Sequence, residues 1–197
     1  MTKIGLTGGM GTGKTTVLRY FKRLGAKVVS CDELVHAELK NNKALQQKIR
    51  KTFGTGVFYK NKIQRPALAK KAFSSKKALD RLNALIHPLA KKRLVEFFKI
   101  CSKNAVVVAE VPLLFEAGFN DLFDVTIGVA TDPKIQRERL RQKCQTSAVS
   151  VIARRMRWQL SLEKKISRCD FVIDNNSNKR KTFNQVKQLM EEKQWKN

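Results

Sequence analysis

The sequence predicts a three-layer α/β protein built on a five-stranded, mainly parallel sheet, and three observations carry this prediction. Short apolar runs alternate with amphipathic segments of helical periodicity along the 197 residues. The run at 105–111 is apolar apart from one carboxylate near its end, as a strand buried on both faces of a sheet is, and 124–130 is expected to be another buried strand. A glycine-rich loop joins the first expected strand, 2–7, to the first expected helix, 16–24. In such a sheet, ligands bind outside the carboxyl ends of the strands.

The glycine-rich loop, residues 8–15, matches the phosphate-binding pattern of a glycine, four residues, then Gly-Lys-Ser/Thr. Its place between a strand and a helix disfavours an ordinary glycine-rich turn and predicts the P-loop NTPase fold. The glycines let backbone N–H groups point at a phosphate, and the helix N-terminus adds partial positive charge. Lys14 is expected to reach the β- and γ-phosphates, and the Thr15 hydroxyl to ligate Mg²⁺. The ATP-binding residues predicted here are Gly11, Thr12, Gly13, Lys14, Thr15 and Thr16.

The stretch between the second expected strand, 26–31, and the third is longer than a crossover between parallel strands requires. We therefore expect residues 33–103 to form a helical substrate-binding region. Pro66 suits the first turn of one of its helices, and Ser75 can cap another. His87-Pro88 is expected to interrupt a helix. The expected helices are 33–40, 43–53, 65–73 and 76–86, followed after the interruption by 89–100.

The remaining chain is predicted to complete the core and to supply a lid. Pro133 is expected to open a charged helix that runs through Lys143, and Ser147 can cap a second, arginine-rich helix. Residues 171–173 are expected to form the last strand, and Asn178 to cap the final helix. The predicted division is a core at 1–32, 104–140 and 160–197, the helical region at 33–103 and the lid at 141–159.

Polar residues follow the expected strands, and we predict that they converge on one crevice. They are the P-loop, Asp32, Glu110, Asp132 and Asn175. Asp32 can accept a hydrogen bond from an acceptor hydroxyl and receive its proton. The alternative is that Asp32 only caps the helix that starts at Glu33.

Arginines beside the lid can neutralise phosphate oxygens through fork-like contacts. Arg139, Lys143 and Arg155 are the candidates because they flank the expected lid segment at 143–150. Three further arginines are expected to be solvated, namely Arg137, Arg141 and Arg157.

The chain is strongly basic, with 41 Lys and Arg against 16 Asp and Glu and a net charge of +25. A nucleic-acid partner is the first implication of such a charge. The basic residues are dispersed, however, so any nucleic-acid binding is predicted to be weak and sensitive to salt. No stretch approaches the roughly 20 apolar residues of a membrane helix. The absence of a signal-peptide pattern and the four scattered cysteines favour a cytoplasmic location.

The chain resembles the dephospho-coenzyme A kinase family along nearly its whole length. The P-loop alone would indicate only a broad superfamily, but further motifs follow it in the family's order. Cys31-Asp32-Glu33-Leu34 is similar to the segment that carries the family's catalytic aspartate. The other matching segments are 5–16, 82–88, 111–116, Gln136 with Arg139, Arg155 with Gln159, and 170–175.

The resemblance implies ATP-dependent phosphorylation of the ribose 3′-hydroxyl of dephospho-coenzyme A, the last step of coenzyme A synthesis. It implies Mg²⁺ with ATP, a nucleoside-monophosphate-kinase-like core, a helical substrate domain and a lid. It places Asp32 and Lys14 in catalysis and Arg139 and Asn175 at ATP. For two residues, a purely structural role is as good an explanation as contact with substrate: His87 can belong to a helix-breaking pair, and Pro112 can belong to a turn at the end of a strand. The substrate-facing residues it implies are Asp32, Arg65, His87, Pro112, Leu113 and Glu116.

Three positions depart from the family pattern. Glu110 stands where an aspartate is usual, which leaves its contact with the metal shell or the substrate open. Lys143 replaces a common arginine and loses the bidentate fork. Asn176-Ser177 stands where the family usually has a small residue followed by glycine, directly after Asn175, and this difference weakens the match in the loop expected near adenine.

Two alternatives stay open. One is another small-molecule kinase on the same fold, acting on a nucleotide, shikimate or gluconate; the motifs within 32–116 argue against it. The other, from a different class, is a nucleic-acid-binding protein, which the charge of +25 suggests.

Overall fold

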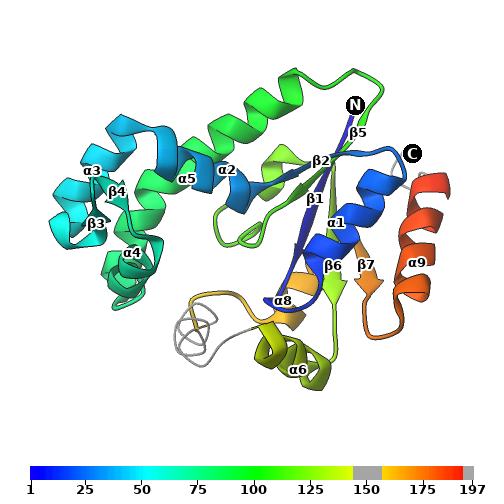
Figure 1. Cartoon of the computed structure of the whole chain (residues 1–197). Coiled ribbons are helices and arrows are strands. Elements are labelled where there is room, and N and C mark those ends of the chain that lie inside the picture. Colours follow the sequence, from blue (N-terminus) through cyan, green and yellow to red (C-terminus); the bar gives the residue numbers. More distant parts are fainter. Residues whose placement is uncertain (144–156, 193–197) are drawn as a thin grey trace.

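The computed structural model describes residues 1–143 and 157–192, and a five-stranded parallel sheet lies at its centre (Figure 1). The strand order is β2-β5-β1-β6-β7, so the strand that leads into the P-loop is the middle one. Its two neighbours come from much later in the chain, with Thr2 opposite Val106 and Ile4 opposite Val125. The five predicted strands are confirmed. Their bounds are β1 Thr2–Gly8, β2 Lys27–Ser30, β5 Val106–Glu110, β6 Val125–Ala130 and β7 Phe171–Asp174.

Helices surround this sheet, and a small hairpin of two further strands lies outside it. The hairpin, β3 Phe58–Tyr59 with β4 Lys62–Ile63, turns at Lys60 and Asn61, which both have positive φ. Asn61 suits such a turn, because asparagine tolerates the left-handed region. The α-helices are α1 Lys14–Arg23, α2 Cys31–Asn41, α3 Lys43–Phe53, α4 Arg65–Ala72, α5 Lys76–Lys99, α6 Pro133–Lys143, α8 Leu162–Ile166 and α9 Lys179–Glu192, with short 3₁₀ turns η1 Thr55–Val57 and η2 Asn120–Leu122.

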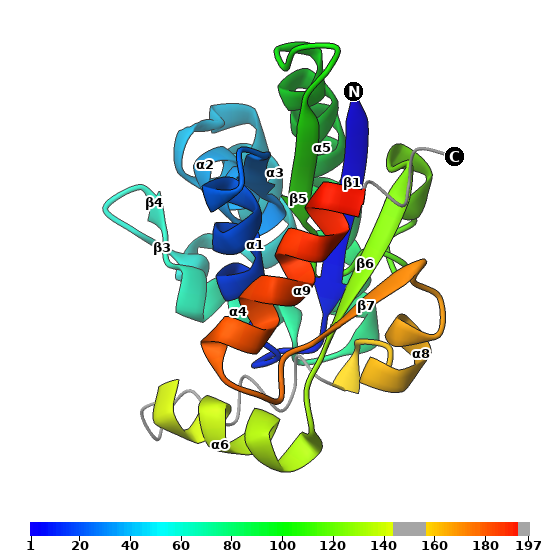
Figure 2. The same ribbon diagram turned by 90° about the vertical axis from the view of Figure 1, so that its right-hand side faces the viewer.

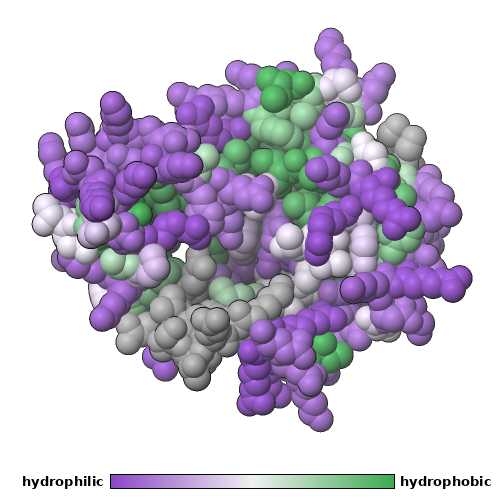
Figure 3. Space-filling view, in the orientation of Figure 1, coloured by the Kyte–Doolittle hydropathy of each residue, from purple (hydrophilic) through white to green (hydrophobic). Residues whose placement is uncertain are grey.

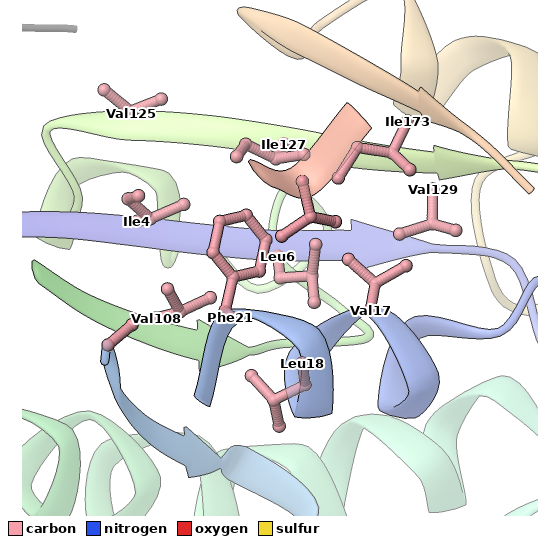
Figure 4. Packing of buried hydrophobic residues seen from close by; sticks show 12 residues of the cluster. Ile4, Leu6, Val17, Leu18, Phe21, Val108, Val125, Ile127, Val129 and Ile173 are labelled. Atoms are coloured by element: carbon pink, nitrogen blue, oxygen red, sulfur yellow. The ribbon is translucent and has the colours of Figure 1, made fainter. Parts of the chain in front are cut away.

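One face of the sheet is covered by α1 and α9, which lie next to each other (Figure 2). Val17 and Phe21 of α1 recur at helical spacing and are fully buried against Ile4 and Leu6 of β1 (Figure 4). Val186 of α9 completes this cluster. Burial of side chains of this size contributes about 1.5–3 kcal/mol each. The packing therefore fixes the start of α1, and with it the P-loop, on the end of β1.

The opposite face is covered by the C-terminal half of α5 and by α8. Leu94 and Phe98 of α5 pack on Val107 and Ala109 of β5. Helix α8 lies so close to β6 that a β-carbon on Gly128 would be 2.5 Å from the Ile166 side chain. The sheet is therefore covered on both faces, as the alternation of strands and helices predicted.

Helices α2 to α5 form a helical unit beside the sheet (Figure 1). It has a hydrophobic cluster of its own, which includes Leu39, Ile49, Leu68 and Leu82. Helix α2 begins where β2 ends, and α5 extends from this cluster to the sheet. The helical unit is therefore attached at the carboxyl end of β2 and along α5.

The predicted interruption at His87-Pro88 is wrong, because α5 continues through Pro88 as a single 24-residue helix. Proline removes one helical hydrogen bond and costs about 3 kcal/mol in a helix interior. Here Leu79 and Leu82 are buried in the helical unit, and Leu94 and Phe98 are buried against the sheet. Burial at both ends outweighs the local cost.

The surface is mainly hydrophilic, as expected for a chain with many charged residues dispersed along its sequence. Hydrophilic side chains cover most of the face shown in Figure 3, including the helical unit. Within the described residues, no helix combines the length and the apolar character needed to cross a membrane. Three cysteines in the described part, Cys31, Cys101 and Cys169, are free.

Candidate active site

The P-loop turns tightly between β1 and α1 because its glycines adopt a backbone that L side chains avoid. Gly13, the N-cap of α1, has φ +94°, and Gly11 has φ +82°. A β-carbon on Gly13 would run into the Asn175 amide nitrogen. The first turn of α1 contains no acidic residue. The loop thus presents glycine backbone and a helix N-terminus at one place, which is the arrangement that binds phosphate.

Lys14 is the first residue of α1, and its side chain lies along the P-loop. It is only 9% exposed. Its Nζ donates to the Gly9 carbonyl at 2.8 Å and to the Gly8 carbonyl at 3.2 Å. The ammonium group is therefore held at the loop rather than extended into solvent.

Asn175, the first residue after β7, ties the P-loop to the last strand. Its Nδ2 donates to the Thr12 carbonyl at 2.7 Å, and its Oδ1 accepts from Thr182 Oγ1 at 3.0 Å. Asn175 and Thr182 are both buried. The structure thus brings Asn175 to the P-loop, and both ends of its amide are engaged within the protein.

Helix α6 packs against the other side of the same loop. Arg139 donates through Nη2 to the Asn175 carbonyl at 2.9 Å and through Nη1 to Thr131 Oγ1 at 3.4 Å. Thr131 in turn donates to the Thr12 carbonyl at 3.1 Å. Gln136 donates to the Met10 carbonyl at 2.6 Å. These bonds place the Arg139 guanidinium beside the start of α1.

Glu110, the last residue of β5, lies opposite Thr15. The Thr15 hydroxyl is 3.3 and 3.4 Å from the two carboxylate oxygens of Glu110. Glu110 is 8% exposed, and this burial raises the pKa of its carboxyl group. Lys14 and the Thr15 hydroxyl act in the opposite direction, while the charge of Asp32 adds to the increase. A hydroxyl and a carboxylate placed side by side are hard oxygen donors of the kind that Mg²⁺ prefers.

Asp32 lies in the first turn of α2, not at the end of β2. Strand β2 ends at Ser30, whose hydroxyl accepts from the Glu33 N–H at 3.4 Å. Ser30 is therefore the N-cap, and the alternative that Asp32 serves only as the cap is wrong. The carboxylate of Asp32 is exposed. Burial and then this carboxylate raise the pKa of Cys31 to about 12, so the thiol stays protonated.

The register of the sheet brings Asp32 to the P-loop side. Ser30 of β2 pairs with Glu110 of β5, and Glu110 pairs with Leu6 of β1, which leads into the P-loop. Asp32 follows Ser30 by two residues and shifts the pKa of Glu110. Of the residues predicted to converge, the P-loop with Lys14 and Thr15, Glu110 and Asp32 thus gather at the carboxyl ends of three adjacent strands.

The loop after β5, residues 112–118, is held by α5 on one side. Lys91 donates to the Gly118 carbonyl at 2.6 Å. The ring of His87 meets the ring of Phe119 edge to face, with centroids 6.0 Å apart. Burial, followed by the nearby charge of Lys91, lowers the pKa of His87. The imidazole is therefore neutral at pH 7.

Helix α8 holds the same loop on the other side. Lys165 donates to the Pro112 carbonyl at 2.6 Å and pairs with Glu116 Oε1 at 3.0 Å. The same oxygen accepts from the Leu160 N–H at 2.9 Å. Leu113 is half-buried in this loop. Pro112, Leu113 and Glu116, all predicted to face substrate, are thus brought together with His87 around one loop.

Two other candidates, Arg65 and Asp132, make no hydrogen bond or ion pair with the P-loop among the described residues. Arg65 is exposed at the first residue of α4. Asp132 caps α6 by accepting from the Lys134 N–H at 2.7 Å. Lys143 ends α6, while Ser147 and Arg155 lie outside the described residues. Three other arginines are exposed, as predicted, namely Arg137, Arg141 and Arg157.

Lys165, Thr131 and Thr182 were not predicted from the sequence. A signal for Lys165 existed, because residues 162, 165, 166 and 169 lie on one helical face and the other three are apolar. No comparable signal marks the two threonines, since both bond to segments far from them in the chain.

Comparison with known proteins identifies the family of this chain. A family model described as Dephospho-CoA kinase (CoaE) matches residues 2–181. A dephospho-CoA kinase from Fusobacterium nucleatum is 34% identical over 194 residues, covering 95% of this chain and 96% of the relative.

Solved structures extend the likeness to the whole fold. A structure described as TT1252 from Thermus thermophilus matches with a TM-score of 0.81 and 29% identity, covering 97% of each chain. A dephospho-CoA kinase from Campylobacter jejuni matches with a TM-score of 0.69 and 26% identity, covering 97% of this chain and 98% of that one. With its P-loop, its helical unit and a family match over most of its length, this chain belongs to the dephospho-CoA kinase family.

Proposed function

We propose that this protein transfers the γ-phosphoryl group of ATP to the ribose 3′-hydroxyl of dephospho-coenzyme A, giving coenzyme A and ADP in the last step of coenzyme A biosynthesis. The observation that carries the proposal is the meeting of Lys14, Glu110 and Asp32 at adjacent strand ends in a member of this family. A cation, a metal-binding carboxylate and a hydroxyl-orienting carboxylate are what phosphoryl transfer requires.

ATP binds, on this proposal, with its phosphates in the P-loop. The backbone of Gly11 to Thr16 surrounds them, and Lys14 shifts from the Gly8 and Gly9 carbonyls to the phosphate oxygens. Arg139, already beside the start of α1, adds a second cation. Asn175 lies on the adenine side and supports the site by holding the P-loop, because its side-chain amide bonds Thr12 and Thr182 while its backbone bonds Ala130 and Arg139. Lys143 and Arg155, both within the predicted lid at 141–159, supply further positive charge.

Mg²⁺ fits beside Thr15 and Glu110, whose oxygens are already adjacent. In the described residues, no group of three or more His, Cys, Asp or Glu side chains could hold a metal by itself. The phosphates of ATP and water would therefore complete its shell, as is usual for Mg²⁺ in kinases. When bound, Mg²⁺ neutralises negative charge on the β- and γ-phosphates.

Asp32 orients the acceptor. The 3′-oxygen forms a bond to the γ-phosphorus, the bond between that phosphorus and the ADP oxygen breaks, and the hydroxyl proton passes to Asp32. Asp32 is exposed and lies near enough to Glu110 to act on its charge, so an acceptor ribose can reach it beside the P-loop. The acceptor-side residues are Asp32, Arg65, His87, Pro112, Leu113 and Glu116.

The partners we propose are ATP and dephospho-coenzyme A, in the cytoplasm. We expect any nucleic-acid binding to be weak, since the basic residues are dispersed along the sequence. The decisive assay measures ADP release with dephospho-coenzyme A, adenosine nucleotides, shikimate and gluconate as competing acceptors. Dephospho-coenzyme A should be phosphorylated preferentially, with the new phosphate at the 3′-position. Faster turnover of another acceptor would assign the protein to a different small-molecule kinase.

The P-loop role of Gly13 can be tested against a matched glycine. Gly13 and Gly25 have almost the same φ, +94° and +93°, but only the β-carbon of Gly13 would meet Asn175, while that of Gly25 meets nothing within 4 Å. Gly25→Ala should lower the free energy of unfolding by about 1–2 kcal/mol through backbone strain and leave the KM for ATP unchanged. Gly13→Ala should show the same strain and also raise the KM for ATP about 10-fold or more, because Asn175 is displaced. Equal KM values for the two variants would contradict the proposed nucleotide site.

A further inference from the structure

Lys165 is a charged side chain with no exposed surface at all. It lies in α8, is 0% exposed and is among the largest fully buried side chains of the described chain. Lysine is almost never fully buried unless it is paired. Its immediate neighbour Lys164 is exposed, as most lysines of this chain are. The burial of Lys165 therefore needs a specific explanation.

The partners of Lys165 lie in the loop after β5. Its Nζ donates to the Pro112 carbonyl at 2.6 Å and pairs with Glu116 Oε1 at 3.0 Å. These two residues stand at the beginning and near the end of the loop. One ammonium group thus bridges both ends and sets the shape of the segment between them, which contains Leu113.

Glu116 connects this bridge to the chain that precedes α8. Its Oε1 also accepts from the Leu160 N–H at 2.9 Å, and the carboxylate is 14% exposed. Two residues earlier, the ring of Trp158 lies 5.9 Å from Lys76 Nζ at the start of α5. The pair therefore joins three segments, namely the loop after β5, residues 157–160 and α8.

A need for stability alone does not account for this arrangement. Replacing a buried ion pair by apolar residues is often neutral or stabilising, because desolvation offsets the attraction between the charges. An ion pair that also bonds a backbone carbonyl does something that apolar residues cannot, since it fixes the position of that carbonyl. The Pro112 carbonyl follows directly on Glu110 and Val111, at the edge of the catalytic group.

We propose that Lys165 and Glu116 are positioning residues. They hold the loop after β5 in the conformation that binds the acceptor, without touching ATP or the acceptor themselves. This inference rests on the proposed function. It gives Glu116 a role through the protein in place of direct substrate contact, because Oε1 already has two protein partners and Oε2, which has none among the described residues, is buried from solvent. Shifts of about 1 Å in a positioning segment can reduce turnover by orders of magnitude.

The test compares Lys165→Met with the double variant Lys165→Met/Glu116→Gln. The single variant leaves a buried carboxylate without its cation and is expected to be the less stable of the two. The double variant removes that charge but still lacks the bond to Pro112. Both should show a KM for dephospho-coenzyme A raised about 10-fold or more, with the KM for ATP within about 2-fold of wild type.

Two further variants separate the possible explanations. Glu116→Gln alone keeps an Oε1 acceptor for Leu160 and Lys165 and should change the acceptor KM by less than about 3-fold; a larger change would indicate direct substrate contact and overturn the proposal. Lys187→Met removes an amine that pairs with Glu191 at 3.5 Å within α9, on the other face of the sheet from α8, and should leave both KM values unchanged.

The remaining outcomes are equally decisive. A normal acceptor KM in the double variant, or equal shifts of both KM values, would restrict the pair to charge balance or to general stability. If neither Lys165 variant folds, the pair belongs to the fold alone and the proposal fails. Wild-type protein that does not phosphorylate dephospho-coenzyme A would refute the proposed function instead, so the two failures are distinguishable.

Discussion

Replacing Lys14 by alanine is expected to reduce ADP release by about 10³-fold or more while the protein stays folded. The ammonium group is held at the P-loop by two carbonyls, at 2.8 and 3.2 Å. Arg139, the second cation proposed for ATP, is bonded to the Asn175 carbonyl and to Thr131, so it does not replace Lys14 at the loop. Alanine is the best helix former, so α1 should still begin at this position. Steady-state turnover, together with circular dichroism of the same sample, measures both parts of the prediction.

Lys22→Ala is the matched control for this substitution. Lys22 lies on the exposed side of the same helix, so its loss changes the net charge equally without affecting the P-loop. Its turnover should match that of the wild type. Near-normal ADP release by a folded Lys14→Ala protein would remove the P-loop lysine from the mechanism.

Asp32→Asn is expected to lower kcat by about 10²- to 10⁴-fold, the usual range for loss of a general base. Asparagine keeps the size of the side chain and some of its hydrogen bonding, but it cannot receive the proton of the 3′-hydroxyl. ATP should still bind, because Lys14 and the glycines of the loop are untouched. Turnover with dephospho-coenzyme A tests the expected loss of kcat. A nucleotide-binding measurement on the same protein tests whether ATP still binds.

Glu33→Gln provides the control, since Glu33 is the next residue, is also exposed and also lies in the first turn of α2. It removes the same charge from the same helix end and should retain nearly full turnover. Equal losses in the two variants would point to a general electrostatic effect. Loss of ATP binding in Asp32→Asn would move Asp32 into the nucleotide or metal site.

The fold could be predicted from the sequence because its strongest signals are local. The apolar runs at 105–111 and 124–130 are long enough to specify buried strands, and β5 and β6 lie within them. The P-loop pattern needs only consecutive residues, and it places Lys14 and Thr15 by itself. The position of α1 follows from the spacing of Val17 and Phe21.

The parts that sequence reasoning missed depend on contacts between distant segments. Proline at 88 breaks a helix when only local propensity counts, but α5 is anchored in two hydrophobic clusters. Ser30 and Asp32 are both good capping residues, and only the end of the pairing between β2 and β5 decides between them. Asn175 was predicted at the nucleotide site, but its bond to Thr12 was not, because the two residues lie far apart in the chain.

The central place of β1 delays the completion of the sheet during synthesis. Its two partners are β5 and β6, and Ile4 has its β6 neighbour at Val125. At a ribosomal rate of about 5 to 20 residues per second, β1 waits on the order of ten seconds for that strand. The helical unit has its own cluster and can condense in the meantime. The P-loop also bonds Gln136 and Asn175, which follow β6 in the chain, so its contacts are complete only after Asn175 emerges, and a bound nucleotide can stabilise the fully held loop only from that point.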